Sequence, residues 1–156
     1  MKINIILPVF NDWESLNYLL EDISLLKTSN DLNFSTINIL IINDGSTSDI
    51  KIEKKFSNLN IKILHLFNNV GSQKAINIGL RYIKENKNDF DYCIIMDSDG
   101  EDKADDIIKL IKAAENNYKK IVFASRAKRQ DGLFFSFLYR IYLLIFFILT
   151  GRKINF

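Results

Sequence analysis

The sequence predicts an α/β domain built on a mainly parallel sheet with flanking helices. Short isoleucine-rich runs, typical of strands buried on both faces, alternate with segments whose apolar residues recur at helical spacing. The connections are short, and no internal repeat or proline- and glycine-rich linker interrupts the alternation. With 156 residues, of which 47% are apolar and 26% charged, the chain has the composition of one folded domain with a real core.

Five strands and four helices are predicted in alternating order. The strands are Ile3–Val9, Ile37–Ile42, Ile61–Leu66, Tyr92–Met96 and Lys120–Ala124, and the helices cover about 13–28, 47–57, 72–86 and 103–117. The third helix carries Ala75, Ile78, Tyr82 and Ile83 on one face, and Gly79 permits that face to pack closely. We expect each apolar face to lie on the sheet.

An acidic cluster follows the fourth strand. The apolar run ends in four carboxylates within six residues, which are Asp97, Asp99, Glu101 and Asp102. Ligands of α/β sheets bind at the carboxyl ends of the strands, and carboxylate oxygens suit hard cations. The sequence therefore predicts a site for Mg²⁺ or Mn²⁺ here. The alternative is a solvated acidic turn that caps the next helix.

Charge and cysteine usage indicate where the chain acts. The net charge is only +2, but residues 97–106 are strongly acidic and residues 119–131 strongly basic, so acid for a metal and base for a phosphate can lie close together. The single cysteine, Cys93, lies in an apolar run, where we expect it to pack in the core of a protein from a reducing compartment. No signal peptide precedes the first strand, so we expect a cytoplasmic catalytic face.

Four motifs fall at the same predicted sheet edge. They are Pro8-Val9-Phe10-Asn11-Asp12, Ile42-Asn43-Asp44-Gly45-Ser46-Thr47, Asn69-x-Gly71-x-x-x-Ala75-x-Asn77-x-Gly79 and Asp97-x-Asp99. In this order they resemble the inverting nucleotide-sugar glycosyltransferases of the GT-A, family-two type. The run Asp97–Asp102 and Ala124-Ser125-Arg126-x-x-Arg129 look most like the polyprenyl-phosphate glycosyltransferases, relatives of dolichol-phosphate mannose synthase. The resemblance implies a Rossmann-like GT-A domain over residues 1–132.

The resemblance also implies residue roles in binding the nucleotide-sugar donor. Pro8, Val9, Asn11 and Asp12 would line the base and ribose pocket, and Asp44 would accept a hydrogen bond from the base or ribose. Asp12 stands where the family more often has glutamate, and Asn43 where it commonly has a first aspartate, so the base stays open. Asp44 could instead cap a helix starting at Thr47, and Asp12 could cap the helix that contains Trp13.

Phosphate, metal and catalytic roles follow in the same way. Gly71 and Lys74 lie at a helix N-terminus that favours the donor diphosphate. Asp97 would approach the sugar and ribose and join Asp99 at the metal, while Arg126 and Arg129 would form a catalytic fork for a phosphate or else remain solvated surface residues. His65 has no second histidine nearby and is interpreted as structural.

The C-terminal part, residues 133–156, begins with an apolar, aromatic run over 133–149. Such a helix would barely span a bilayer, and Arg140 falls near its middle. We expect an interfacial helix at a membrane surface, with a core or homo-oligomer helix, or a true span, as alternatives. The chain would then be peripheral to, or attached to, the inner face of the membrane.

The sequence thus predicts an inverting, metal-dependent transfer of a sugar from a nucleotide diphosphate to a polyprenyl phosphate, with no nucleic-acid partner. Family members normally continue beyond Phe156, so we expect a truncated, catalytically incomplete chain. A lipid phosphate is already ionised and needs no general base from such a missing portion. The alternatives are a phosphatase of the haloacid dehalogenase type, which also uses Asp-x-Asp, and a non-catalytic nucleotide- or membrane-binding fragment.

Overall fold

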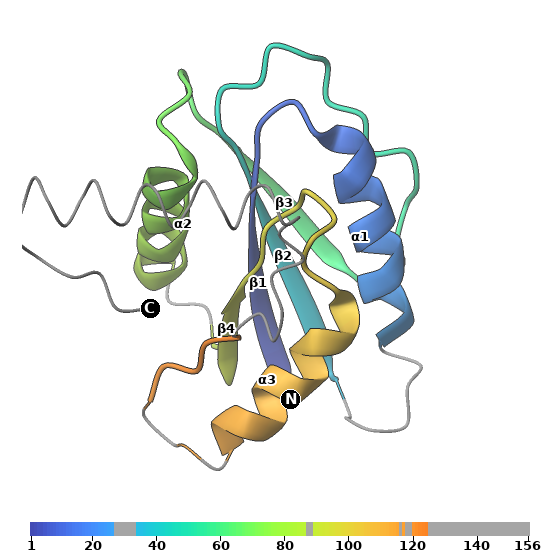
Figure 1. Ribbon diagram of the computed structural model, residues 1–156, viewed down its shortest axis with the longest axis vertical. Helices are drawn as coiled ribbons and strands as arrows, with labels where there is room; N and C mark the ends of the chain where they lie inside the picture. Colours follow the sequence, from blue (N-terminus) through green and yellow to red (C-terminus); the bar gives the residue numbers. More distant parts are fainter. Residues whose placement is uncertain (27–33, 87–88, 116, 118–119, 125–156) are drawn as a thin grey trace, which may run out of the picture. The chain divides into compact units, whose positions relative to one another are not determined.

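The computed structural model describes residues 1–26, 34–86, 89–115, 117 and 120–124 (Figure 1). In chain order the elements are β1 (Lys2–Val9), α1 (Trp13–Leu26), β2 (Thr36–Asn43), β3 (Asn60–His65), α2 (Ser72–Glu85), β4 (Tyr92–Ile95) and α3 (Ala104–Glu115). The four strands form one parallel sheet in the order β3-β2-β1-β4. The predicted α/β class and parallel sheet are confirmed.

The chain divides into two compact units, Met1–Val122 and Phe123–Phe156, and the sheet belongs to the first. The predicted domain boundary after residue 132, the apolar helix over 133–149 and the pair Arg126 and Arg129 lie outside the described residues. Among the helices that are described, none is both long and apolar enough to cross a membrane.

Two apolar layers cover the two faces of the sheet. Helices α1 and α3 lie on one face and α2 on the other, as Figure 1 shows. Along β1 the side chains alternate between these layers: Ile3, Ile5 and Leu7 join the core under α1 and α3, whereas Ile6 joins the core under α2. This alternation of two buried faces explains why the strands read as nearly continuous isoleucine.

Close packing of α2 depends on a glycine. A Cβ atom added to Gly79 would lie 3.1 Å from Ile6 Cγ2 and 3.2 Å from Ile42 Cδ1. These distances are shorter than ordinary van der Waals contact, so a larger residue would fit only if the Ile6 and Ile42 side chains shifted. The predicted packing role of Gly79 is confirmed.

A row of asparagines crosses the α2 face near the amino ends of three strands. Asn4, Asn38 and Asn60 are in register on β1, β2 and β3. Asn60 Nδ2 donates to Asn38 Oδ1 at 3.1 Å, and Asn38 Nδ2 donates to Asn4 Oδ1 at 2.8 Å. Asn4 is 2% exposed, and its Nδ2 has no hydrogen-bond partner among the described residues. The three amides form a hydrogen-bonded ladder that crosses the sheet from the buried Asn4 to the exposed Asn60.

The predicted helix over 47–57 is wrong: this segment is an irregular connection between β2 and β3. The buried side chain of Asn17, on α1, binds its backbone instead. Asn17 Nδ2 donates to the Lys51 carbonyl at 2.6 Å, and Asn17 Oδ1 accepts from the Glu53 N–H at 3.1 Å. Ile52 and Phe56 pack against the core under α1. The Asn17 side chain therefore satisfies two backbone groups that helix formation would otherwise have satisfied.

The predicted strand over 120–124 is also wrong. These residues are irregular, and no strand of the described part of the chain pairs with them. Ile121 and Phe123 are 83% and 84% exposed. A strand forms when a neighbouring strand satisfies its backbone and a face is buried, and within the part of the chain that the structure describes neither condition is met for this run.

Candidate functional site

A cavity of about 350 Å³ opens at the carboxyl ends of the strands. Its lining comes from all four of the predicted motifs and comprises Pro8, Val9, Phe10, Asp12, Asp44, Asn69, Gly71, Ser72, Asp97, Ser98 and Asp99. The structure thus brings together seven of the residues that the sequence nominated. Asn11 and Lys74 lie at the same edge but do not line the cavity.

Pro8 determines where the sheet opens. Pairing between β1 and β4 runs from Ile3 with Tyr92 to Ile6 with Ile95, and one further bond joins the Met96 N–H to the Ile6 carbonyl at 3.2 Å. The next donor on that side of β1 would come from position 8, and proline has no N–H. The pairing of the two strands therefore ends here, and the segments that follow them line the cavity.

Ser98 fastens the acidic loop to β1 beyond that point. Its hydroxyl is buried and donates to the Pro8 carbonyl at 2.9 Å. Within the loop, the Asp97 N–H donates to Asp102 Oδ2 at 2.9 Å, and the Glu101 N–H donates to Asp99 Oδ1 at 3.0 Å. Because the middle residue of Asp97-Ser98-Asp99 is anchored inward, its two acidic neighbours are exposed at the cavity.

Asp44 is a buried carboxylate that organises the start of α2. It is 3% exposed, and its two oxygens accept hydrogen bonds from the Val70 N–H at 2.8 Å and the Gly71 N–H at 2.9 Å. A negative charge at this position also favours the helix N-terminus. Since no helix starts at Thr47, the alternative capping role at that residue is wrong. Asp44 holds the loop before α2 and lines the cavity at the same time.

The N-terminus of α2 keeps part of its donor capacity. Gly71, with φ of 87°, is the N-cap residue and offers no side-chain cap. Its own N–H is shared between Asp44 and Asn69 Oδ1, and the Lys74 N–H donates to the Gly71 carbonyl at 3.0 Å. Ser72 lines the cavity at the first helical position. The helix start at this point is thus suited to an anion, through its dipole and first-turn amides.

Asn11 ties the loop after β1 to the loop after β2. It adopts φ of 60°, a left-handed conformation that asparagine tolerates better than most residues. Its Oδ1 accepts from the Thr47 N–H at 2.8 Å and the Ser48 N–H at 3.1 Å, and its own N–H donates to Ser46 Oγ at 3.0 Å. In this arrangement Asn11 shapes the rim of the cavity from outside the lining.

Asn43 and Asp12 also make structural contacts. Asn43 Oδ1 accepts from the Ser46 N–H at 2.9 Å, and its Nδ2 lies 3.2 Å from His65 Nδ1, so His65 has the structural contact predicted for it. Asp12 Oδ1 accepts from the Ser15 N–H at 3.3 Å, which is the capping interaction at the start of α1. Asp12 lines the cavity as well, so the two roles proposed for it are compatible.

The charge of the cavity is one-sided. Asp12, Asp44, Asp97 and Asp99 line it, and no lysine or arginine does so among the described residues. A phosphorylated ligand would meet several carboxylates and needs a cation between them. Within the described ranges no three His, Cys, Asp or Glu side chains converge as a complete metal-binding group. Asp97 and Asp99 fit the partial set that Mg²⁺ accepts when water and substrate phosphates supply the other ligands.

Sequence reasoning missed three lining residues, Phe10, Asn69 and Ser98, whereas Ser72 lies in the helix start from Gly71 to Lys74 that was expected to favour the diphosphate. Phe10 is 47% exposed although it follows a buried strand, and an exposed aromatic ring at a cavity is a surface on which a planar group can stack. Because Phe10 stands within the first motif, the sequence could have indicated that it lines the cavity. Ser98 carried no signal of its own, because its partner is a backbone carbonyl 90 residues away.

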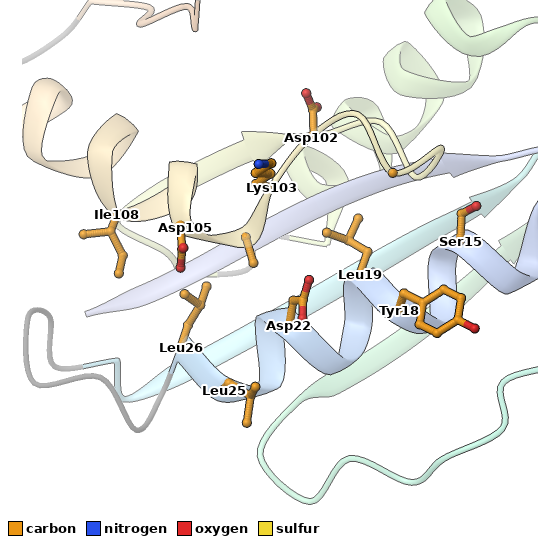
Figure 2. Close-up of a pocket in the computed structure, with 12 residues that line it drawn as sticks. Ser15, Tyr18, Leu19, Asp22, Leu25, Leu26, Asp102, Lys103, Asp105 and Ile108 are labelled. Carbon is orange, nitrogen blue, oxygen red and sulfur yellow. The ribbon is translucent and has the colours of Figure 1, made fainter.

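A second hollow, of about 500 Å³, lies between α1 and α3. Figure 2 shows its side chains, which include Leu19, Leu25 and Ile108 together with Asp22 and Asp105. Gly100 and Asp102 line this hollow, whereas Asp97, Ser98 and Asp99 line the first, so the loop after β4 contributes to both. Of the four carboxylates in the predicted acidic cluster, Asp102 therefore lines the second hollow, and Asp97 and Asp99 line the first.

Comparison with known sequences decides the family. Residues 4–155 match the sequence profile of Glycosyl transferase family 2. The chain belongs to this family. An undecaprenyl-phosphate 4-deoxy-4-formamido-L-arabinose transferase of Photorhabdus laumondii is 31% identical over 137 residues. An uncharacterized glycosyltransferase of Synechocystis is 31% identical over 133 residues.

The alignments cover most of this chain but a minor part of these relatives. They include 85% and 83% of the chain, respectively, and 39% of each relative. Among solved structures, S. aureus TarS superposes with a TM-score of 0.57 at 20% identity, over 83% of this chain and 39% of that one. TarS in complex with UDP-GlcNAc gives a TM-score of 0.54 at the same identity. These superpositions support the GT-A-like α/β fold.

Proposed function

We propose that this family 2 glycosyltransferase chain binds a nucleotide diphosphate sugar together with Mg²⁺ or Mn²⁺ and transfers the sugar, with inversion, to a polyprenyl phosphate. The observation that carries the proposal is the acidic cavity at the strand ends. Four carboxylates line it without a lysine or arginine among the described residues, so a bound cation would offset their repulsion of a diphosphate. The undecaprenyl-phosphate transferase among the relatives supports the choice of acceptor.

The donor would lie across the cavity from the base to the diphosphate. Phe10 offers an exposed ring for the base, and Pro8, Val9 and Asp12 form the wall beside it. Asp44 accepts from a base N–H or ribose hydroxyl through lone pairs not used by Val70 and Gly71, and Asn11 fixes the rim. A uridine donor is supported by the UDP-GlcNAc complex of TarS, a protein of similar fold.

The diphosphate would lie between the start of α2 and the acidic loop. The first-turn amides of α2 and the Lys74 ammonium favour the phosphates, and Asp97 and Asp99 would hold the cation. When bound, the cation neutralises charge on the departing nucleoside diphosphate. Ser98 keeps the two carboxylates in place by anchoring the loop to β1, so that positioning and electrostatics supply most of the rate acceleration. Arg126 and Arg129 remain proposed partners of a phosphate.

A lipid phosphate acceptor suits this arrangement because it is an ionised nucleophile. No proton has to be removed from it, so no general base is needed. Inversion then follows from a single displacement at the sugar carbon, with the acceptor oxygen forming a bond as the bond to the diphosphate oxygen breaks.

The phosphatase alternative has weaker support. Membership of the glycosyltransferase family argues against it, and Asp97 follows the fourth strand of the chain, whereas that class places its nucleophile after the first. We therefore expect no hydrolysis of p-nitrophenyl phosphate. Metal-dependent hydrolysis that disappears in Asp97→Asn would favour the phosphatase instead. A non-catalytic nucleotide-binding fragment would bind donor without turning it over.

Calorimetric titration tests the donor and the metal together. UDP-, GDP- and dTDP-sugars are titrated into the full chain with and without Mn²⁺. We expect one nucleotide to bind more tightly with Mn²⁺, and Asp99→Asn to remove that enhancement. Asp22→Asn, which changes a carboxylate in the hollow between α1 and α3, is the matched control and should keep it. Equal affinity with and without metal would contradict the metal assignment, and no binding of any nucleotide would contradict the function.

A further inference from the structure

The loop between β3 and α2, residues 66–71, presents a fully exposed phenylalanine from a fixed backbone. Phe67 is entirely exposed, and Val70 is 36% exposed. The residues on either side are held: the Leu66 N–H donates to the Asn43 carbonyl at 2.9 Å, and the Val70 and Gly71 N–H groups donate to Asp44. A Cβ on Gly45 would lie 2.5 Å from the backbone of Asn68 and Asn69, so the two loops are in close contact. Phe67 is therefore exposed on an anchored loop.

A cationic stripe continues from this loop along α2. At about 100° per residue, Lys74, Arg81 and Lys84 lie within roughly 80° of one another, on the side opposite the buried Ala75, Gly79 and Ile83. All three are exposed, and none takes part in the ion pairs of the described residues. Glu85 is the single acidic residue of the helix, so its outer face is net positive.

One further apolar side chain extends this surface, because Leu80 is 40% exposed on α2. The surface thus combines exposed apolar side chains at the helix start with positive charge along the helix. That combination is typical of proteins that bind the headgroup region of a bilayer, where rings enter the interface and cations meet anionic lipids.

We propose that loop 66–71 and the outer face of α2 form a membrane-docking surface for anionic lipid headgroups. The choice of a bilayer over a protein partner rests in part on the proposed function, because a polyprenyl phosphate stays in the membrane. The same loop lines the donor cavity through Asn69 and Gly71, with Ser72 next to it. Docking through Phe67 therefore brings the cavity to the bilayer surface, where the lipid phosphate is.

Sedimentation of the full chain with vesicles tests this surface. Vesicles of phosphatidylglycerol and phosphatidylethanolamine are compared with vesicles of phosphatidylcholine. The double variant Arg81→Gln/Lys84→Gln should weaken binding to the anionic vesicles by about 25-fold at low salt, or about fivefold per charge. Phe67→Ser should weaken it by about tenfold. High salt should reduce the effect of the charges.

Matched variants on the opposite side of the sheet serve as controls. Tyr18→Ser removes an aromatic side chain that is 63% exposed on α1, and Lys51→Gln/Lys55→Gln removes two exposed charges from the connection between β2 and β3. Both should bind vesicles as the unchanged protein does. The proposal would be overturned if the Phe67 and Arg81/Lys84 variants bound anionic vesicles as tightly as the unchanged protein. It would also be overturned if the control variants lost as much vesicle affinity as these variants.

A fluorescent probe gives an independent readout. The single tryptophan of the chain, Trp13, is 4% exposed, so Phe67→Trp adds the one indole that a bilayer can reach in the described part of the chain. Its emission should shift to shorter wavelength with anionic vesicles and be quenched by brominated lipid, and an unchanged spectrum would contradict docking. Calorimetry with nucleotide sugars separates the two hypotheses: vesicle binding without nucleotide binding would refute the proposed function and leave the docking surface standing.

Discussion

Substituting Asp44 by asparagine tests how far one buried carboxylate organises the site. At 3% exposure it receives the Val70 and Gly71 N–H groups on separate oxygens. Asparagine keeps one acceptor and turns an NH₂ group toward the other donor. A hydrogen bond to a charged group contributes about 1.5–3 kcal/mol, and a charge at a helix N-terminus about 0.3–1 kcal/mol. Because Gly71 also donates to Asn69, we expect a loss near the low end, about 2 kcal/mol.

A loss of this size should lower the melting temperature by about 4–8 °C in a chain of this length. Thermal denaturation followed by circular dichroism measures it, and Asp49→Asn, an exposed carboxylate on the neighbouring loop, is the matched control and should melt with the unchanged protein. Calorimetry on the same samples gives donor affinity, which should fall as well if Asp44 contacts the base or ribose. A melting temperature equal to that of the control would refute the reasoning from the two hydrogen bonds.

Three further predictions concern other contacts. Ser98→Ala removes the bond to the Pro8 carbonyl and should weaken Mn²⁺-dependent donor binding by about two- to tenfold, whereas unaltered affinity would mean that the loop is held without it. Asn17→Ala leaves the Lys51 carbonyl and Glu53 N–H without their partner and should lower the free energy of unfolding by about 1–3 kcal/mol in urea titrations, with faster hydrogen exchange at Glu53. Burial raises the pKa of the Cys93 thiol to about 11, so alkylation near pH 8 should be about a hundredfold slower in the folded chain than in urea. Folding raises the pKa of the Cys93 thiol. The contribution of this thiol to the free energy of unfolding is therefore complete below the unfolded-state pKa and is lost as the pH rises toward 11.

The sheet and the location of the site could be predicted from the sequence because both follow from local patterns. Isoleucine-rich runs marked β1, β2, β3 and β4, and parallel strands bring the residues at their carboxyl ends to one edge. Asp12, Asp44, Asp97 and Asp99 meet at one cavity for that reason.

The errors arose where distant contacts decide the structure. The charged segment over 47–57 has residues common in helices, but Asn17 on α1 binds its backbone as part of an irregular connection. The run over 120–124 has strand-forming residues, but no described strand pairs with it. The hydrogen bond that anchors Ser98 and the two hydrogen bonds that Asp44 accepts from backbone N–H groups likewise depend on partners far away in the sequence, which no periodicity reveals.

The asparagine ladder has a consequence for how the strands find their alignment. β1 and β2 are both so rich in isoleucine that sliding one past the other by two residues would keep every side chain on its proper face. That slide would place Asn4 opposite Thr36 or Leu40, and would break its bond to Asn38 inside the sheet. It would also displace Pro8 from Ile42 by about 7 Å, at 3.3 Å per residue, and so separate the motifs that form the cavity. The hydrogen-bonded asparagines at one end of the strands thus help to fix the strand register on which the binding site at the other end depends.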